Sequence, residues 1–228
     1  MNYATISADV ISYTLLPEPE KRKLESGIRQ LISDFSIRFE KHNFYGRLVQ
    51  GDYFECAIDD PKYALRIALL LKTYVKSFEL GIKKGDKAKL KYFMEYGIRL
   101  AVAVASLTKL DPINGIIDGE AIYLSGRTIK SMSTSDKQKI VIKNTMFFCS
   151  PDSVLEEQFD TLFSLLDTVI SRCSAKQSEV VYYKLLSFSE KEIAGKLNKN
   201  QSTISQHSTA AGWLSIEKAM HYFENTIQ

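Results

Sequence analysis

The run from Ala4 to Thr14 constrains the fold of this chain more than any other stretch. It begins with small and β-branched residues, the composition of a buried strand. It ends in one acid, Asp9, with Ser and Thr residues close behind, which favour loops and helix caps. A carboxylate at the end of a buried strand is costly unless a positive group meets it. The fold therefore has to bring Asp9 a partner.

A second acid, Asp52, follows Gly51 between two strand-like runs, 44–50 and 53–58. A Gly-Asp pair in this position predicts a hairpin turn. Two interpretations fit the acids from the residues alone. Either Asp9 and Asp52 converge on divalent cations, or Asp9 caps the next helix and Asp52 forms the turn.

The run 7–14, Ser-Ala-Asp-Val-Ile-Ser-Tyr-Thr, resembles the small-Ala-Asp-Ile-x-x-aromatic-Thr run of class III nucleotidyl cyclases. In that family an Asp ends the first strand and a Gly-Asp turn supplies the second carboxylate. The resemblance covers residues 3–145 and implies a ferredoxin-like nucleotidyl cyclase-type domain of the α+β class. It also implies that Asp9 and Asp52 hold Mg²⁺ or Mn²⁺ together with a nucleotide.

A third motif, residues 119–127, resembles the Gly-x-x-Val-Asn-x-small-x-Arg helix of the same family. There the Asn and Arg lie one helical turn apart and reach the ribose and phosphates. The Arg is kept as Arg127, whereas Tyr123 replaces the Asn. The resemblance implies a nucleotide site of Asp9, Asp52, Tyr123 and Arg127, with Arg127 as the catalytic residue if the domain is active.

Other positions depart from the family pattern. The purine-reading residues are replaced by Leu48 and Ile116, and Ala101 and Ala103 replace the glycines usual on the central strand. Loss of one positioning donor typically costs roughly 100- to 1000-fold in rate. The combined replacements favour a non-catalytic descendant with a sensing or structural role over an active enzyme.

The periodicity of apolar residues predicts an α+β order of β-α-β-β-α-β-α-β before residue 150. The expected elements are a strand at 4–10, a helix at 17–42, strands at 44–50 and 53–58, a helix at 60–78, a strand at 94–106, a turn at 114–115, a helix at 118–132, a strand at 139–142 and another from 147.

The pattern changes after residue 150, which predicts two domains, 1–150 and 151–228. A heptad-like seam follows, and further apolar residues at 163, 165 and 170 widen it. The width favours a helix packed in a bundle over a coiled-coil dimer. The seam consists of Leu155, Phe159, Leu162, Leu166, Val169 and Cys173.

Residues 189–207 resemble the helix-turn-helix segment of LuxR-type and sigma-factor regulators. Ser189 and Glu192 form a capping box, and Ala194, Asn198 and Ile204 have the spacing of a small residue, a turn residue and a branched residue. Helices at 178–186 and 214–227 are expected to complete an all-α helix-turn-helix domain around Trp213. A cyclase-like domain joined to such a module resembles the SatD-like family.

This second resemblance implies binding of duplex DNA. Lys196 and Lys199 beside the turn are expected to contact phosphates. The helix that opens at residue 201 is expected to read base edges in the major groove. Its candidate base-reading residues are Gln201, Ser202, Ser205 and Gln206.

Charge and composition limit these expectations. The net charge of the 228-residue chain is only +3, and residues 187–228 carry four Lys, four Glu and no Arg. Phosphate contacts normally supply much of the affinity for DNA, so a monomer is expected to bind weakly and a homodimer is predicted. Three cysteines without a C-x-x-C pair, no signal peptide and short apolar runs predict a cytoplasmic protein that does not enter membranes.

The leading hypothesis is a DNA-binding transcriptional regulator with a degenerate nucleotidyl cyclase-like sensing domain that binds metal and nucleotide. The alternative is an active, divergent nucleotidyl cyclase with an attached helix-turn-helix targeting domain. A third interpretation is an interaction module that uses neither site.

Overall fold

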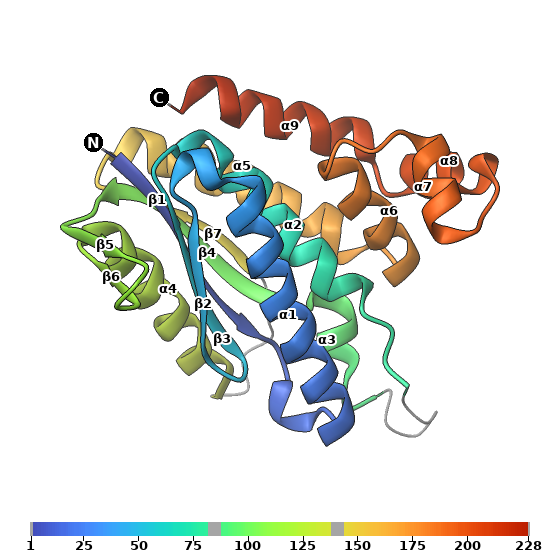
Figure 1. Ribbon diagram of the computed structural model, residues 1–228, viewed down its shortest axis with the longest axis horizontal. Helices are drawn as coiled ribbons and strands as arrows, with labels where there is room; N and C mark the ends of the chain where they lie inside the picture. Colours follow the sequence, from blue (N-terminus) through green and yellow to red (C-terminus); the bar gives the residue numbers. More distant parts are fainter. Residues whose placement is uncertain (1, 82–87, 138–143, 228) are drawn as a thin grey trace.

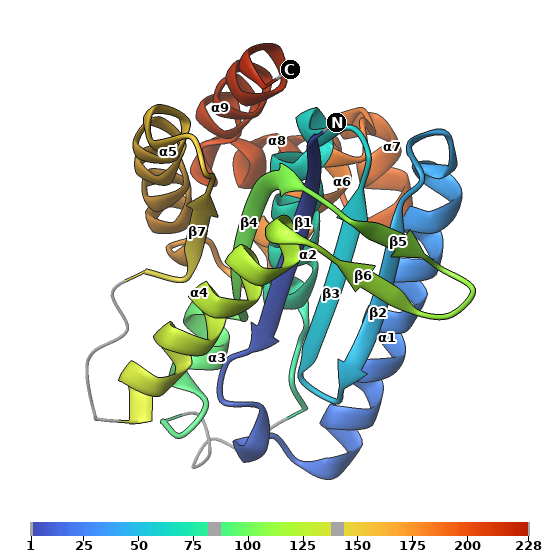
Figure 2. The ribbon, with the colours of Figure 1, turned by 90° about the vertical axis from the view of Figure 1, so that its left-hand side faces the viewer.

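A computed structural model describes residues 2–81, 88–137 and 144–227 of the chain. Its centre is a five-stranded sheet in the order β2-β3-β1-β4-β7, so the first strand lies in the middle (Figure 2). β1 pairs antiparallel with β3 and β4, whereas β4 and β7 run parallel. The strands span Asn2–Val10 (β1), Tyr45–Gln50 (β2), Tyr53–Ile58 (β3), Ile98–Ser106 (β4) and Met146–Cys149 (β7).

Helices cover both faces of this sheet. Figure 2 shows α4 and the small β5–β6 hairpin in front of the sheet, with α1 and α2 behind it. The molecule is therefore a mixed α+β structure, as the periodicity predicts. The bounds are Glu18–Arg38 (α1), Ala64–Ser77 (α2), Lys91–Tyr96 (α3), Lys109–Asp111 (β5), Ile116–Asp118 (β6) and Glu120–Lys137 (α4), with 3₁₀ turns at Tyr13–Leu15, Glu40–His42 and Pro61–Tyr63.

Most of the helices and strands expected from the sequence are present, with differences at particular elements. The predicted strand pair with Gly51-Asp52 at its turn is confirmed as β2 and β3. The expected strand at 94–106 is wrong at its start, because residues 91–96 form α3 and Gly97, at φ 67°, separates this helix from β4. The β5–β6 hairpin around Asn114-Gly115 was not predicted beyond its turn. The expected strand at 139–142 lies outside the described residues.

The side chains of β1 alternate between two environments, because successive residues of a strand point to opposite faces. Ala4, Ile6, Ala8 and Val10 belong to the main apolar core. The intervening residues Thr5, Ser7 and Asp9 face the α4 side. The same alternation continues in β4, where Ala101 and Ala103 are fully buried opposite Ser7 and Thr5. Small residues on this face allow α4 to pack closely against the sheet.

Of the last five helices, α5, α6 and α9 fold onto the same core, which includes residues from both sides of position 150. The Phe148 ring of β7 lies 5.3 Å from Phe159 and 6.0 Å from Phe223, centroid to centroid. Figure 1 shows α5 and α9 beside the sheet layer and α7 and α8 at the far end of the molecule. The helices span Ser153–Ser171 (α5), Ala175–Leu185 (α6), Glu190–Leu197 (α7), Gln201–Ala210 (α8) and Trp213–Thr226 (α9).

The heptad-like seam of α5 packs against the main apolar core of the same chain. Phe159, Leu166 and Cys173 are buried in the main core, and the other seam residues pack against it. Phe163 and Ile170, which widen the stripe, are also fully buried, whereas Leu165, the third residue expected to widen it, is 62% exposed. The bundle interpretation is therefore confirmed. Half of the seam is therefore taken up inside the chain, while Leu155, Leu162 and Val169 stay partly exposed, so a coiled-coil dimer through this seam is not supported.

Two lysines of α2, one turn apart, tie α5 and the sheet together. Lys72 is fully buried, and its Nζ lies 2.9 Å from Asp167 Oδ1 on α5. It also donates to the carbonyl of Ile98 and to Thr145 Oγ1. Lys76 Nζ donates to the carbonyls of Met94, Glu95 and Ser171, which belong to the last turns of α3 and α5. No helix among the described residues is long and apolar enough to cross a membrane.

The small bundle at the far end has its own core. Val180 of α6, Ile193 and Ala194 of α7, and Ile204 of α8 form a separate buried cluster. Trp213 instead belongs to the main core. The prediction that Trp213 would be the centre of this bundle is wrong, because α9 turns its apolar face toward α2 and α5.

Candidate functional site

The first candidate site lies on the α4 side of the sheet, where polar side chains replace apolar ones. Ser125 of α4 is fully buried, and its Oγ lies 3.2 Å from Thr5 Oγ1 and 2.9 Å from Ser7 Oγ. A Cβ on Gly126 would lie 3.6 Å from the Tyr53 hydroxyl. The helix thus rests directly on a row of hydroxyl groups that leads along β1 to Asp9.

Asp9 has an ion-pair partner inside the sheet. It lies opposite Arg99 of β4, and the Arg99 Nε to Asp9 Oδ1 distance is 3.5 Å. The two side chains are 6% and 20% exposed for Arg99 and Asp9. Sequence analysis missed Arg99 because it falls within an otherwise apolar strand. The available signal was the alternation of β4, which places residue 99 on the same face as Ala101 and Ala103.

Tyr53 is the other neighbour of Asp9, across the β1–β3 pair. Burial raises the pKa of Tyr53 above its ordinary value, the Glu55 and Asp9 carboxylates raise it further, and a hydrogen bond with Ser7 lowers it. The phenol is therefore held neutral and acts as a hydrogen-bonding group. Glu55 lies on the same face as Tyr53, as the two-residue repeat of the strand predicts.

Asp52 is brought to the same end of the sheet by its backbone. The amide of Val10 donates to the carbonyl of Asp52 at 2.9 Å, so the hairpin turn is fixed beside the end of β1. A Cβ on Gly51 would lie 2.5 Å from the Tyr13 hydroxyl, so a larger residue in this turn would require the Tyr13 side chain to move. Burial and Glu25, followed by Asp52, raise the pKa of Tyr13. The Asp52 carboxylate thus contributes to the raised pKa of Tyr13, whereas the Asp9 carboxylate contributes to the raised pKa of Tyr53.

A metal ion at these acids stays a prediction. No cluster of three or more His, Cys, Asp or Glu side chains that could hold a metal occurs within residues 2–81, 88–137 and 144–227. Mg²⁺ often needs only one or two carboxylates when phosphates and water complete its shell. Asp9 and Asp52 fit that requirement in number. The Arg99 guanidinium, however, already supplies positive charge to Asp9 and would compete with a cation.

Tyr123 and Arg127 lie one turn apart on the exposed side of α4. Ser125, between them in sequence, points into the sheet, so these two side chains face away from the hydroxyl row. The Tyr123 hydroxyl donates to Asp118 Oδ1. That hydrogen bond, more than any other contact, raises the pKa of Tyr123. Their participation in a nucleotide site with Asp9 and Asp52 stays a prediction.

The edge strand β2 carries an arginine that the motif comparison did not select. Arg47 donates from Nε and Nη2 to Glu55 Oε2, at 3.0 and 2.7 Å, and also to the carbonyl of Gly115. It therefore links the β5–β6 hairpin to the sheet. Leu48, at the position of the purine-reading residue, packs against the main core.

The second candidate site is the helix pair α7 and α8. The side chain of Ser189 accepts from the Glu192 amide and Glu192 accepts from the Ser189 amide, which confirms the predicted capping box. Asn198 ends α7 in the left-handed conformation at φ 50° and ψ 52°, as its predicted turn role requires. α8 then begins at Gln201, with Ile204 buried against α6 and α7.

The candidate DNA-contact residues lie on the outer side of this pair. Ser202 and Gln206 are exposed on the face of α8 opposite Ile204. Gln201 is also exposed and Ser205 is half-buried, on the flank of the same helix. Lys196 and Lys199 are exposed beside the turn, and Lys196 Nζ lies 4.5 Å from the centre of the Phe188 ring.

No protein family and no curated protein matches this sequence significantly. Two solved structures of a bacterial light-regulated adenylyl cyclase are similar. The first has 9% sequence identity and a TM-score of 0.44, and its match covers 64% of this chain and 74% of the cyclase chain. The second has 10% sequence identity and a TM-score of 0.43, and its match covers 65% of this chain and 43% of the cyclase chain. At such scores no property of those enzymes is transferred to this chain.

Proposed function

We propose that this protein is a DNA-binding regulator whose α7–α8 pair is a helix-turn-helix and whose sheet region is a non-catalytic relative of nucleotidyl cyclase domains. The observation that carries the proposal is the polar outer face of α8, which is exposed at one end of the molecule (Figure 1). A recognition helix needs such a face to enter the major groove. Ser202 and Gln206 supply groups suited to base edges.

Internal pairing of acids makes this end more favourable to DNA than its composition indicates. Glu224 of α9 is turned inward and paired with Arg66 of α2, at 2.8 Å. Glu190 lies 3.4 Å from Lys184, and Glu192 is used in the capping box. Two of the four glutamates after residue 187, Glu190 and Glu224, are therefore paired with cations within the chain, whereas hydrogen bonds from Ser189 lower the pKa of Glu192 and keep it charged. The repulsion that the two paired glutamates would exert on phosphates is reduced.

The strand order supports the cyclase-like part of the proposal. Strands β4, β1, β3 and β2 form an antiparallel sheet in that spatial order, with α1 and α2 on one face. This is the arrangement that a ferredoxin-like βαββαβ unit produces. A sensing role, in preference to turnover, is favoured by the buried Arg99 beside Asp9 and by Tyr123 at the position of the ribose-binding Asn.

The test of DNA binding uses the full chain and duplex fragments selected from a random pool at low salt. We expect retention of a subset of duplexes by a dimer of known mass. Gln206→Ala should change base preference at one position by about 1–3 kcal/mol. Lys199→Ala should weaken all duplexes evenly and reduce the salt slope by about one.

Lys109→Ala is the matched control, because Lys109 lies on β5 at the other end of the molecule (Figure 1). It should leave both affinity and salt slope unchanged. If a demonstrated dimer retains no duplex at low salt, the α7–α8 pair is an interaction module and the proposal is wrong.

The rival enzymatic function is tested separately. The protein is incubated with ATP or GTP and Mn²⁺, and cyclic nucleotide is measured. We expect none, or turnover far below ordinary enzymatic rates, which are about 1–1000 s⁻¹. Product formed at such rates, and lost in Asp9→Ala, would establish the active cyclase instead.

A further inference from the structure

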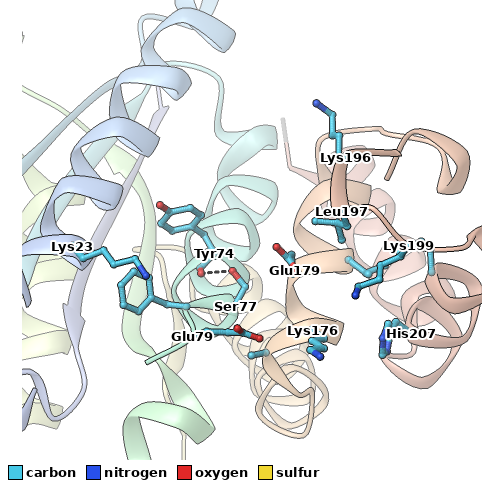
Figure 3. A pocket seen from close by; sticks show the side chains of 14 residues that line it. Lys23, Tyr74, Ser77, Glu79, Lys176, Glu179, Lys196, Leu197, Lys199 and His207 are labelled. Atoms are coloured by element: carbon cyan, nitrogen blue, oxygen red, sulfur yellow. Dashed lines mark hydrogen bonds between the residues drawn. The ribbon is translucent and has the colours of Figure 1, made fainter. Parts of the chain in front are cut away.

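A cavity of about 670 Å³ lies between the end of α2, the start of α6 and the α7–α8 pair (Figure 3). Small-molecule sites commonly have volumes of roughly 300–1000 Å³, so this space suits a compound of mononucleotide size. Apolar and charged groups both line it. The Lys, Glu and His residues of the lining are Lys23, Lys176, Lys196, Lys199, Glu79, Glu179 and His207.

The charge of the lining is positive. Four of the lining residues are lysines and two are glutamates, which leaves an excess of two positive charges when His207 is neutral. Figure 3 shows Lys176, Lys199 and His207 directed toward the same part of the space. α6 begins here, at Ala175, and the N-terminal end of a helix adds further positive potential. An anion is therefore favoured on this side of the cavity.

Glu179 lies within electrostatic reach of Glu79, Lys176 and Lys199. Burial and the Glu79 carboxylate raise the pKa of Glu179, whereas Lys176 and Lys199 lower it. The two lysines therefore act electrostatically on a half-buried carboxylate inside the cavity. Lys23 and Lys196 are positioned differently, because their ammonium groups lie over the rings of Phe78 and Phe188 at 4.9 and 4.5 Å.

We propose that this cavity binds a small phosphorylated molecule of about mononucleotide size. The phosphate lies between Lys176 and Lys199, since lysine is a common phosphate-binding group. The apolar part of the ligand lies against Phe78, Leu197 and Ile204, which line the same space. This site is separate from Asp9 and Asp52, which lie at the end of β1.

The regulatory consequence rests on the proposed DNA binding. Lys196 and Lys199 both line the cavity and stand beside the turn that would contact DNA phosphates. A bound phosphate neutralises Lys199, so ligand and duplex compete for it. The ligand therefore lowers the affinity for DNA.

Binding is measured by calorimetry on the full chain with AMP, pyrophosphate and adenosine as probes. We expect AMP to bind and adenosine, which lacks the phosphate, to bind at least about tenfold more weakly. Lys176→Gln and Lys199→Gln should each weaken AMP by about fivefold. Glu179→Gln removes a negative charge and should tighten AMP by about threefold. Lys191→Gln, an exposed α7 residue outside the cavity, is the control and should change nothing.

The binding results for AMP, pyrophosphate and adenosine each support or overturn the proposed phosphate site. Binding of pyrophosphate as well as AMP supports recognition of the phosphate itself, and binding of AMP alone supports recognition of phosphate together with the nucleoside. Equal binding of adenosine and AMP overturns it. So does an AMP affinity that ignores Lys176 and Lys199, or an absence of binding of AMP and pyrophosphate at millimolar concentration.

A labelled duplex separates this inference from the proposed function. If AMP binding depends on Lys176 and Lys199 as expected but no duplex is retained, the proposed phosphate site is supported and the DNA-binding proposal fails. If a duplex is retained but neither phosphate probe binds, the cavity proposal fails alone. If both bind, AMP should displace the duplex from the wild type more readily than from Lys176→Gln.

Discussion

Two ion pairs of the described residues, Lys72–Asp167 and Arg99–Asp9, lie on opposite sides of β4 and differ in how completely they are enclosed. On the α2 side, Lys72 and Asp167 are 2.9 Å apart with side-chain exposures of 0% and 4%. On the α4 side, Arg99 and Asp9 are 3.5 Å apart, and Asp9 retains 20% exposure. The pair between α2 and α5 is closed to solvent, whereas the pair at the end of β1 opens toward it.

The surroundings of the two pairs differ in the same direction. Lys72 also donates to Ile98 and Thr145, and Asp167 accepts from both the amide and the hydroxyl of Thr145. Burial lowers the pKa of Lys72, and the Asp167 carboxylate acts in the opposite direction. A buried charge pair persists only when its remaining donors and acceptors are satisfied. The Lys72–Asp167 pair is therefore enclosed and joins α2 to α5, whereas the Arg99–Asp9 pair is partly open to solvent.

The largest expected effect is in the enclosed pair. Lys72→Met leaves the Asp167 carboxylate buried without its cation, and we expect a loss of about 3–5 kcal/mol in the free energy of unfolding. Denaturation by urea measures it. The double variant Lys72→Met/Asp167→Leu removes both charges and should recover at least half of the loss. If the double variant is no more stable than Lys72→Met, the unpaired carboxylate is not the cause.

A smaller effect is expected at the open pair. Arg99→Met leaves Asp9 partly exposed, so water compensates some of the lost interaction. We expect a loss of about 1–3 kcal/mol, between the values for exposed and buried pairs. The same variant tests competition with metal. If Arg99 supplies the charge that a cation would supply, Mn²⁺ should raise the melting temperature of Arg99→Met more than that of the wild type.

Arg99→Met/Asp9→Asn is the control for this metal effect, because it removes the carboxylate as well. The added Mn²⁺ stabilisation should disappear in it. Equal Mn²⁺ responses in the wild type and Arg99→Met would show that Arg99 does not take the place of a cation.

The comparison also shows what sequence patterns reveal. Turn chemistry and short-range periodicity predict β1, the Gly51-Asp52 hairpin and the α7–α8 pair, because each depends on residues close in the chain. Neither ion pair was predicted. Arg99 and Lys72 sit in runs that are apolar on both sides, and their partners lie 90 and 95 residues away. A charge in such a run is a signal of a buried partner, but the partner's identity requires the sheet register and helix packing.

The same limit explains the wrong placement of Trp213. Its sequence position suggested the centre of the C-terminal bundle, yet the main core takes it. The core of the α6, α7 and α8 bundle consists of four buried apolar side chains, with three partly buried ones packed against it. Which of two adjacent cores receives a large side chain depends on tertiary packing that local periodicity does not encode.

The smallest expected effect concerns the hydroxyl row that leads to the open pair. Ser125→Ala removes the hydroxyl that lies within 3.2 Å of Thr5 and 2.9 Å of Ser7, and leaves both without this partner beneath α4. A buried hydrogen bond contributes about 0.5–1.5 kcal/mol, so we expect a loss of roughly 1 kcal/mol in urea denaturation. Thr161→Ala is the matched control, because the Thr161 hydroxyl bonds only a carbonyl of its own exposed turn, and we expect no measurable change. A loss in Ser125→Ala no larger than in the control would mean that the polar face of β1 is not held by these hydroxyls, and that α4 rests there on its small residues alone.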